Sequence, residues 1–335
     1  MSKKILFICG SLNQTTMMHS ISQHFKEYDC FFTPYYGDSW IKYGVSKGYG
    51  KFSILNGPFR IRTEEYLREQ NLTMDYRGEK HDYDLVYTCA DLIMPKNIRD
   101  KKVILVQEGM TDPENLMFYL VKYLKLYRWL ASTSTMGISN QYTFFCVASQ
   151  GYRDFFIRKG AKAEKIIVTG IPNFDNLKQY AKNDFPHKNF VLVATSDARE
   201  TYKLENRKKL IKDCVRIANG RQLIFKLHPN ENIERATVEI NKYAPGALVY
   251  SDGNINQMIA SSDALITKFS STVYVGIFFG KEVYSYYDIN DLKKLLPIQN
   301  NGTSAGRIAG LGRHLMDFPD ASNEEIHALF DSGQN

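Results

Sequence analysis

Short apolar runs alternate with longer stretches of mixed polarity along most of the chain. Runs of this kind cover residues 4–9, 31–34, 84–90, 102–106, 144–148, 165–169 and 190–194. Between them, stretches such as 17–25, 114–131 and 150–159 have the length and composition of helices. Continuous apolar runs are typical of strands that are buried on both faces of a parallel sheet. The pattern therefore predicts an α/β protein.

Two further apolar runs, in the stretch 221–280, end at residues suited to binding an anion. The first leads to Lys226, His228 and Pro229, and the second leads to Ser270, Ser271 and Thr272. Ligands of α/β proteins lie beyond the carboxyl ends of strands, and a helix that starts there directs N–H groups at an anion. His-Pro turns and serine helix caps are also common without any ligand. Their pairing in consecutive strand-helix units favours a nucleotide-phosphate site.

The same stretch carries a resemblance to a known family. The order KLHPNE and then TKFSSTVYVGIFFGKEV resembles the carboxyl half of GT-B glycosyltransferases. It is most similar to the group of CDP-glycerol glycerophosphotransferases, Kdo transferases and bacterial sialyltransferases, which have a His-Pro motif and a Ser-Ser/Thr motif. The segments VTGIPNFDN at 168–176 and VLVATSDARET at 191–201 agree with it. The resemblance spans 103–285 and implies two Rossmann-like domains that face each other across a cleft.

Length and composition are consistent with this division. The chain has 335 residues, of which 44% are hydrophobic and 24% are charged, as in globular proteins of two ordinary domains. A polar stretch at 179–189 reads as a linker. We expect an acceptor domain at 1–180, a nucleotide-donor domain at 188–312, and a C-terminal helical segment at 313–335, with a helix near 322–330, that packs back on the first domain.

Cysteine usage and charge indicate the compartment of the protein and the kind of ligand it binds. The five cysteines are an odd number without a CxxC pair, which indicates a reducing compartment and no zinc site. The apolar run at 4–9 is too short for a signal peptide or a membrane span, so we expect a cytoplasmic protein. The net charge of +7 is dispersed and suits an anionic substrate or a membrane surface as well as nucleic acid. With the resemblance, we expect a nucleotide-activated sugar and no nucleic acid.

Candidate acceptor-side residues follow two strands of the first domain. Ser11, Asn13 and His19 come after the first strand and become acceptor contacts if the resemblance holds, although a plain strand-to-helix turn also explains them. Glu108 comes directly after the strand at 102–106 and beside a glycine. A carboxylate there can accept the proton of an acceptor hydroxyl, so Glu108 is our first candidate for the general base. Asp112 is the second candidate and Asp91 the third.

The resemblance also implies a set of donor contacts and a mechanism without metal. The expected donor-binding residues are Arg199, Lys226, His228, Pro229, Ser270, Ser271 and Thr272, with Gly170 and Asn173 at the domain junction. N–H groups and cations can neutralise the leaving phosphate, so we expect neither a metal ion nor another cofactor.

The stretch 114–131 has two interpretations. Lys122, Lys125 and Arg128 recur at steps of three residues and are interleaved with aromatic residues. Such a helix is either a core helix with an exposed cationic stripe or an interfacial helix that lies on anionic lipid. Three cations in this length argue against a transmembrane span.

The sequence thus predicts a glycosyltransferase that moves a group from a CMP-, CDP- or UDP-linked donor to a hydroxyl of a cell-surface polysaccharide or lipid-linked glycan. Hexosyl, Kdo and glycerophospho transfer are not separated by these motifs. The expected location is the cytoplasm, including the inner face of the plasma membrane. Two alternatives stay open. A UDP-N-acetylglucosamine 2-epimerase shares the architecture, but DLVYTCADL lacks the Gly-Asp of that family. A non-catalytic nucleotide- or carbohydrate-binding relative is the other.

Overall fold

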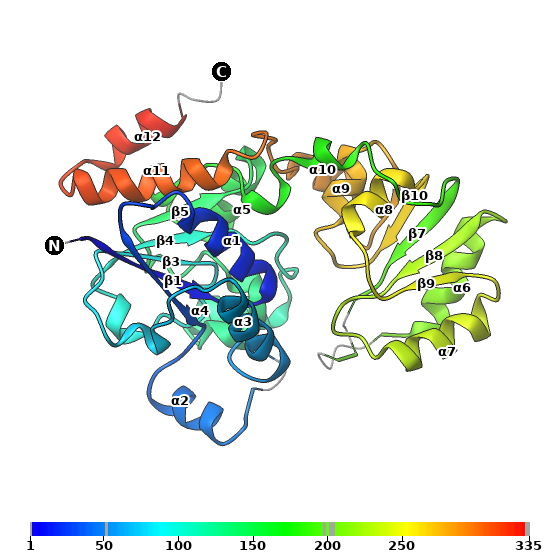
Figure 1. Cartoon of the computed structure of the whole chain (residues 1–335), viewed down its shortest axis with the longest axis horizontal. Helices are drawn as coiled ribbons and strands as arrows, with labels where there is room; N and C mark the ends of the chain where they lie inside the picture. Colours follow the sequence, from blue (N-terminus) through cyan, green and yellow to red (C-terminus); the bar gives the residue numbers. More distant parts are fainter. Residues whose placement is uncertain (1, 51–52, 197–198, 201–204, 332–335) are drawn as a thin grey trace. The chain divides into compact units, whose positions relative to one another are not determined.

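The protein is described by a computed structural model that covers residues 2–50, 53–196, 199–200 and 205–331 (Figure 1). The chain forms two compact units. Unit 1 consists of Met1–Asp175 and Pro297–Asn335, and unit 2 consists of Asn176–Leu296. Each unit contains its own parallel sheet with helices packed against it, so the α/β class predicted from the apolar runs is confirmed.

The sheet of unit 1 has six strands in the order β2-β1-β3-β4-β5-β6. They are β1 (Lys4–Cys9), β2 (Asp29–Pro34), β3 (Leu85–Thr88), β4 (Lys102–Val106), β5 (Phe144–Val147) and β6 (Ile166–Val168). All neighbouring strands are parallel, and most of their side chains are buried. The chain leaves β1 towards β2 and then continues on the other side of β1 with β3. This reversal makes the carboxyl ends of β1 and β3 the expected ligand edge of unit 1.

Helices of unit 1 come from both ends of the chain. They are α1 (Leu12–Ser22), α2 (Ser39–Ser46), α3 (Gly57–Glu69), α4 (Leu116–Leu124), α5 (Gln150–Lys159), α11 (Ser304–Asp317) and α12 (Asn323–Asp331), with short 3-10 turns η1 (Tyr76–Gly78), η2 (Lys96–Ile98), η3 (Arg128–Thr135), η4 (Ala163–Lys165) and η5 (Pro172–Phe174). The buried Tyr87 donates its hydroxyl to the carbonyl oxygen of Ile308 over 3.1 Å. A side chain at Gly312 would meet that hydroxyl, so α11 lies directly on the sheet.

The sheet of unit 2 has five parallel strands in the order β11-β10-β7-β8-β9. They are β7 (Phe190–Ala194), β8 (Gln222–Lys226), β9 (Leu248–Tyr250), β10 (Ala264–Thr267) and β11 (Glu282–Tyr284). The helices are α6 (Arg207–Ala218), α7 (Ile233–Tyr243), α8 (Ile255–Ser261), α9 (Val273–Phe278) and α10 (Ile289–Lys294), after the turn η6 (Leu177–Tyr180). The strand order reverses between β7 and β10, as in a Rossmann domain, which marks their carboxyl ends as the ligand edge.

Several expected elements have different bounds in the structure. The helix predicted at 114–131 ends at Leu124, because Lys125 adopts a left-handed conformation with φ of 53° and the chain continues as η3. The segment that follows β2 contains α2, which none of the expected helices covers. Unit 1 ends at Asp175 where we expected 180, and it resumes at Pro297 where we expected 313. No helix in the described ranges is long and apolar enough to cross a membrane.

An ammonium group is buried beneath α4. Lys159, at the end of α5, is 1% exposed, and its Nζ has no hydrogen-bond partner among the described residues. Nζ lies 4.9 Å from the ring centre of Phe155 and 5.5 Å from those of Phe118 and Phe156. Burial lowers the pKa of Lys159 to about 8, and the charge of Glu114 opposes this shift in part. The aromatic rings therefore hold a cation that water no longer solvates.

Replacing Lys159 with Met is expected to raise the free energy of unfolding by about 1–2 kcal/mol near neutral pH, because the desolvation cost of the ammonium exceeds the cation–π gain. An unfolded lysine keeps its proton up to about pH 10, so the cost is present below the folded pKa and declines as the pH rises above it. The gain should therefore shrink towards pH 10. Urea unfolding followed by the fluorescence of Trp40 and Trp129, both in unit 1, measures it. A variant less stable than the parent at neutral pH contradicts this account.

Candidate functional site

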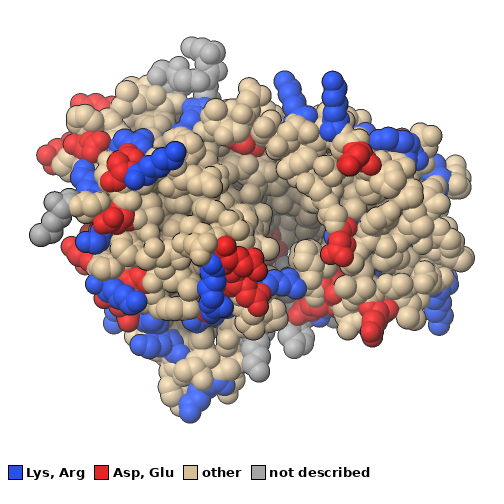
Figure 2. Space-filling model, in the orientation of Figure 1, with Lys and Arg blue, Asp and Glu red and all other residues tan. Residues whose placement is uncertain are grey.

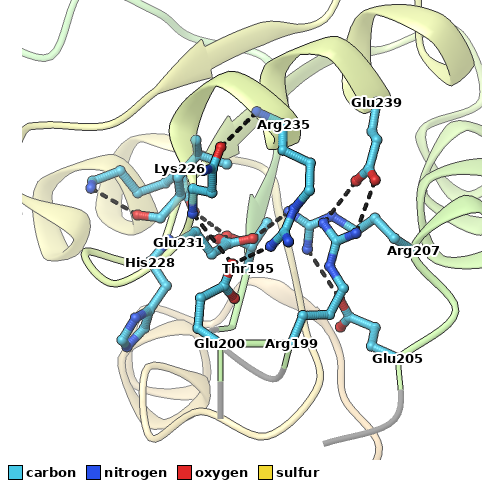
Figure 3. A network of polar contacts seen from close by, with 12 residues as sticks. Thr195, Arg199, Glu200, Glu205, Arg207, Lys226, His228, Glu231, Arg235 and Glu239 are labelled. Carbon is cyan, nitrogen blue, oxygen red and sulfur yellow. Dashed lines mark hydrogen bonds and ion pairs between the residues drawn. The ribbon is translucent and has the colours of Figure 1, made fainter. Parts of the chain in front are cut away.

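The loop after β8 is held by a buried carboxylate (Figure 3). Glu231 is 7% exposed and accepts hydrogen bonds from the backbone N–H of His228 (2.9 Å), from Arg207 Nη2 (2.6 Å) and from Thr195 Oγ1. The N–H of His228 also donates to Thr195 Oγ1 over 3.1 Å. Thr195 directly follows β7, so the network joins the carboxyl ends of β7 and β8. Glu231 and Thr195 therefore hold the backbone N–H of His228 in place.

The imidazole of His228 points away from this network (Figure 3). The ring is half-buried, the next residue, Pro229, is exposed, and Nδ1 accepts the N–H of Asn230 over 3.3 Å. An accepting Nδ1 leaves the ring proton on Nε2, which is the tautomer that donates to an oxygen through Nε2. The loop thus presents a hydrogen-bond donor at the ligand edge of unit 2.

Two predicted donor contacts are engaged inside unit 2. Lys226 Nζ is buried and donates to the carbonyl oxygens of Leu227 (3.1 Å) and Ser251 (2.6 Å), and burial lowers the pKa of Lys226. Arg199 directs both terminal nitrogens at the carboxylate of Glu239, over 2.9 and 2.8 Å. Through these contacts both cations stabilise the loops around β8 and α7.

The hydroxyl-rich segment after β10 also differs in detail from the prediction. Ser270 Oγ accepts hydrogen bonds from the N–H of Thr272 (3.3 Å) and from Thr272 Oγ1 (3.0 Å), and no side chain caps α9 at Thr272. The three hydroxyl residues from Ser270 to Thr272 are half-buried, at the carboxyl end of β10. Strands β8 and β10 flank β7, so their ends are about 10 Å apart. One ligand that lies across the end of β7 can reach both segments.

A second cluster of hydrogen-bonded side chains, in unit 1, is centred on a carboxylate. Glu108 Oε1 accepts hydrogen bonds from Ser11 Oγ (3.0 Å) and Asn13 Nδ2 (3.1 Å), and Oε2 accepts one from Gln14 Nε2 (2.5 Å). Asn13 Oδ1 in turn accepts one from Asn173 Nδ2 over 3.0 Å. The structure therefore brings together four residues predicted separately. Gln14 was not predicted, although it stands three positions after the helix cap Ser11, where a side chain faces the same loop.

The geometry of this cluster suits a carboxylate that is held by several donors and keeps one acceptor direction for a substrate. Three donors from the described residues occupy three of the roughly four lone-pair directions of Glu108. The side chain crosses from the end of β4 to the start of α1, at the ligand edge of the sheet. A hydroxyl that donates to Glu108 would approach from that edge.

Other predicted residues of unit 1 lie outside this cluster. His19 Nδ1 pairs with the hydroxyl of Tyr66 over 2.9 Å, and burial lowers the pKa of His19. Asp112 Oδ2 accepts from Thr133 Oγ1 over 2.9 Å, so it joins the loop after β4 to η3. Gly170 has φ of +72°, and a side chain there would meet Ser304 Oγ at 2.5 Å. Its role in the structure is close packing of the returning chain.

Asp91, the third base candidate, is fully buried. Its carboxylate accepts the backbone N–H groups of Gly137 (2.9 Å) and Ser139 (3.1 Å). Within the described ranges, no group of three or more His, Cys, Asp or Glu residues is placed to hold a metal ion.

Comparisons with known structures place the chain among two-domain proteins of one fold. UDP-GlcNAc 2-epimerase from Neisseria meningitidis, bound to UDP-GlcNAc, is 13% identical, with coverage of 97% of this chain and 94% of that chain and a TM-score of 0.55. The Methanocaldococcus jannaschii UDP-GlcNAc 2-epimerase, in complex with UDP-GlcNAc and UDP, is 14% identical, with coverage of 92% and 99% and a TM-score of 0.54. At this identity the likeness concerns the fold, and the GT-B expectation of two Rossmann-like domains is confirmed.

The sequence itself identifies the family. No curated protein matches the chain. The family model described as CDP-Glycerol:Poly(glycerophosphate) glycerophosphotransferase matches residues 99–287, more than half of the 335 residues. That range contains Glu108, the His228 loop and the hydroxyl segment at Ser270. The chain therefore belongs to the CDP-glycerol:poly(glycerophosphate) glycerophosphotransferase family, and it is a transferase that uses a nucleotide-activated donor.

Proposed function

We propose that this transferase moves a sugar or glycerophosphate group from a CDP-, CMP- or UDP-linked donor to a hydroxyl of a cell-envelope glycan or lipid-linked acceptor. Unit 2 binds the donor and unit 1 binds the acceptor, on the cytoplasmic side of the membrane. The observation that carries the proposal is the His228 loop. A buried network fixes its backbone at the ligand edge of a Rossmann-like sheet, and the imidazole points away from that network.

In the proposed mechanism, unit 2 stabilises the leaving group. His228 Nε2–H and the hydroxyls of Ser270, Ser271 and Thr272 donate to the phosphate oxygens of the donor. Hydrogen bonds to a developing negative charge lower the barrier without requiring a metal ion. Pro229 lies in a turn in which the N–H of Glu231 donates to the carbonyl oxygen of His228 over 2.9 Å, and its fixed φ suits that turn. Arg199 and Lys226 support the neighbouring loops through the internal contacts described above.

Unit 1 activates the acceptor in this mechanism. Glu108 accepts the proton of the acceptor hydroxyl while the hydroxyl oxygen forms the new bond. The bond to the leaving phosphate oxygen breaks with its electron pair, and the nucleotide departs. Ser11, Asn13, Gln14 and Asn173 orient the carboxylate through the hydrogen bonds of the cluster. General base catalysis of this kind contributes about 10²–10⁴-fold to a rate.

A 2-epimerase activity is the second candidate, favoured by the fold shared with the two epimerases. It needs a further acid in unit 1. The acid that follows β3 is Asp91, whose carboxylate accepts two backbone N–H groups and is fully buried. Incubation with UDP-N-acetylglucosamine in the absence of an acceptor distinguishes the two, since only an epimerase converts the sugar.

The proposal predicts that a pyrimidine nucleotide stabilises unit 2. A ligand at about 100 times its dissociation constant adds ~2.7 kcal/mol to the free energy of unfolding, which raises the melting temperature of a domain of this size by roughly 10 °C. A thermal-shift screen with CMP, CDP, UDP, GDP and PRPP measures the effect. The expected result is a shift with cytidine or uridine nucleotides, and equal shifts with all five compounds, or none with any, would contradict it.

A further inference from the structure

The chain after the Glu108 loop carries large apolar side chains on its outside. Leu116, Tyr123, Leu124 and Tyr127 are 75%, 72%, 64% and 62% exposed. The others exposed in the same stretch are Met117, Tyr119, Leu120, Leu126, Trp129 and Leu130. Isolated apolar residues are normal at a protein surface, but a contiguous patch of this kind marks a contact with another apolar phase.

Helix α2 extends the patch. Trp40, Tyr43 and Tyr49 are exposed on or just after α2. The ring of Trp40 lies 5.7 Å from that of Tyr127 and 5.6 Å from that of Trp129, so the two segments meet. We call residues 39–49 and 116–130 together the aromatic surface. It contains both tryptophans of the chain.

The inner side of the aromatic surface is tied to unit 1. On α4, Phe118 and Val121 are buried, and the ring of Phe118 covers the ammonium of Lys159. At η3, Arg128 donates from Nε (3.2 Å) and Nη2 (2.9 Å) to the carbonyl oxygen of Asp91. These contacts fix which side of the segment faces outward. The exposed side chains therefore cannot turn into the core, and burying them requires a second phase.

The charge of the aromatic surface indicates what kind of surface covers its exposed side chains. Its two sequence segments contain Lys42, Lys47, Lys122, Lys125 and Arg128, with Glu114 as the nearest acid before the second segment. Figure 2 shows Lys and Arg atoms at the tip of unit 1 that α2 forms in Figure 1. A twofold contact between two copies would bring these cations against one another, which is unfavourable. An anionic lipid surface instead complements both the cations and the aromatic rings.

We propose that the aromatic surface binds the protein to anionic bilayers, with its apolar side chains among the headgroups and acyl-chain ends. Tyrosine and tryptophan favour this depth because an apolar ring and a polar group share one side chain, and lysine can extend its ammonium to the lipid phosphates. The tie to unit 1 orients the Glu108 cluster relative to the lipid surface. Membrane binding of this kind needs neither a donor nor catalysis. It can therefore be tested independently of the proposed function.

The two tryptophans report the contact directly. With the full chain and vesicles of phosphatidylcholine containing phosphatidylglycerol, the fluorescence of Trp40 and Trp129 should shift to the blue and be quenched by lipids brominated on the acyl chain. Vesicles of phosphatidylcholine alone should give a much weaker response, because the cations contribute little there. Absence of both responses with anionic vesicles would overturn the proposal.

Two sets of substitutions test separately the cations and the apolar side chains of the aromatic surface. The triple variant Lys42→Gln, Lys47→Gln, Lys125→Gln should weaken partition into anionic vesicles about a hundredfold. Arg128 is left unchanged because it holds Asp91. The variant Tyr123→Ser, Leu124→Ser, Tyr127→Ser should lose the quenching by brominated lipids, and since these side chains are exposed it should keep the parent melting temperature.

The matched control is Lys208→Gln, Lys209→Gln, Lys212→Gln on α6, three exposed cations of unit 2. It should bind vesicles like the parent. Equal loss of binding in both lysine variants would show attraction by net charge alone and overturn the proposal. A parent that forms dimers in analytical ultracentrifugation, ignores vesicles and becomes monomeric in the serine variant would assign the surface to a second copy of the chain and also overturn it.

Discussion

Glu108→Gln is expected to lower transfer to an acceptor by ~10²–10⁴-fold, the contribution of a general base, while nucleotide affinity stays at the parent value. Glutamine keeps the length of the side chain and one acceptor oxygen, so part of the contact with Ser11, Asn13 and Gln14 survives. It cannot accept the proton of the acceptor hydroxyl. The measurement is the initial rate of nucleotide release from the donor, with and without acceptor.

A positioning role for Glu108 would give a different pattern from a base. If the carboxylate only orients the start of α1, Glu108→Gln should raise the KM for the acceptor and leave the pH dependence of kcat unchanged. If Glu108 is instead the general base, Glu108→Gln should remove the acidic limb from the pH profile of kcat. Asp112→Asn is the control, since Asp112 lies outside the cluster and bonds to Thr133. If that variant loses activity while Glu108→Gln retains it within a few-fold, the base is assigned wrongly.

Local sequence patterns were sufficient to predict the strands and the sheet edges at which they end. The apolar runs at 102–106, 144–148 and 190–194 correspond to β4, β5 and β7 almost residue for residue. Because carboxyl ends of parallel strands share one edge, the residues that follow them can be grouped from the sequence alone. Ser11, Asn13 and Glu108 each follow a strand of unit 1 and so belong to one edge of its sheet, and the structure joins all three.

Contacts between distant segments could not be predicted in the same way. Glu231 stands in the KLHPNE motif, but its function depends on Thr195 and Arg207, which belong to other strand-helix units. Nothing in the local spacing indicates that a glutamate three residues after His228 is buried. The same holds for Lys226, which reads as a free cation at a strand end but bonds to two carbonyl oxygens.

The end of helix α4 at Leu124 also depends on contacts between distant segments. The spacing of cations and aromatics over 114–131 fits one long helix, and lysine is a good helix former in the interior of a helix. In the structure Lys125 takes the left-handed conformation. Arg128 then binds the carbonyl oxygen of Asp91, and Thr135 Oγ1 binds that of Arg128. These tertiary contacts override the helical pattern, and both pieces carry exposed apolar side chains, such as Tyr123 and Tyr127.

Titration calorimetry of a cytidine or uridine nucleotide with the parent, His228→Ala and the control His81→Ala tests the donor site most directly. The substitution removes the imidazole and its contact with the N–H of Asn230, while Glu231 and Thr195 still hold the backbone N–H of residue 228. His81 is exposed and lies in unit 1. We predict saturable binding that His228→Ala weakens by ~1.5–3 kcal/mol, roughly 10- to 150-fold, the range for a hydrogen bond to a charged group, and that His81→Ala does not change. Equal nucleotide affinity in all three proteins would contradict a donor site at the His228 loop.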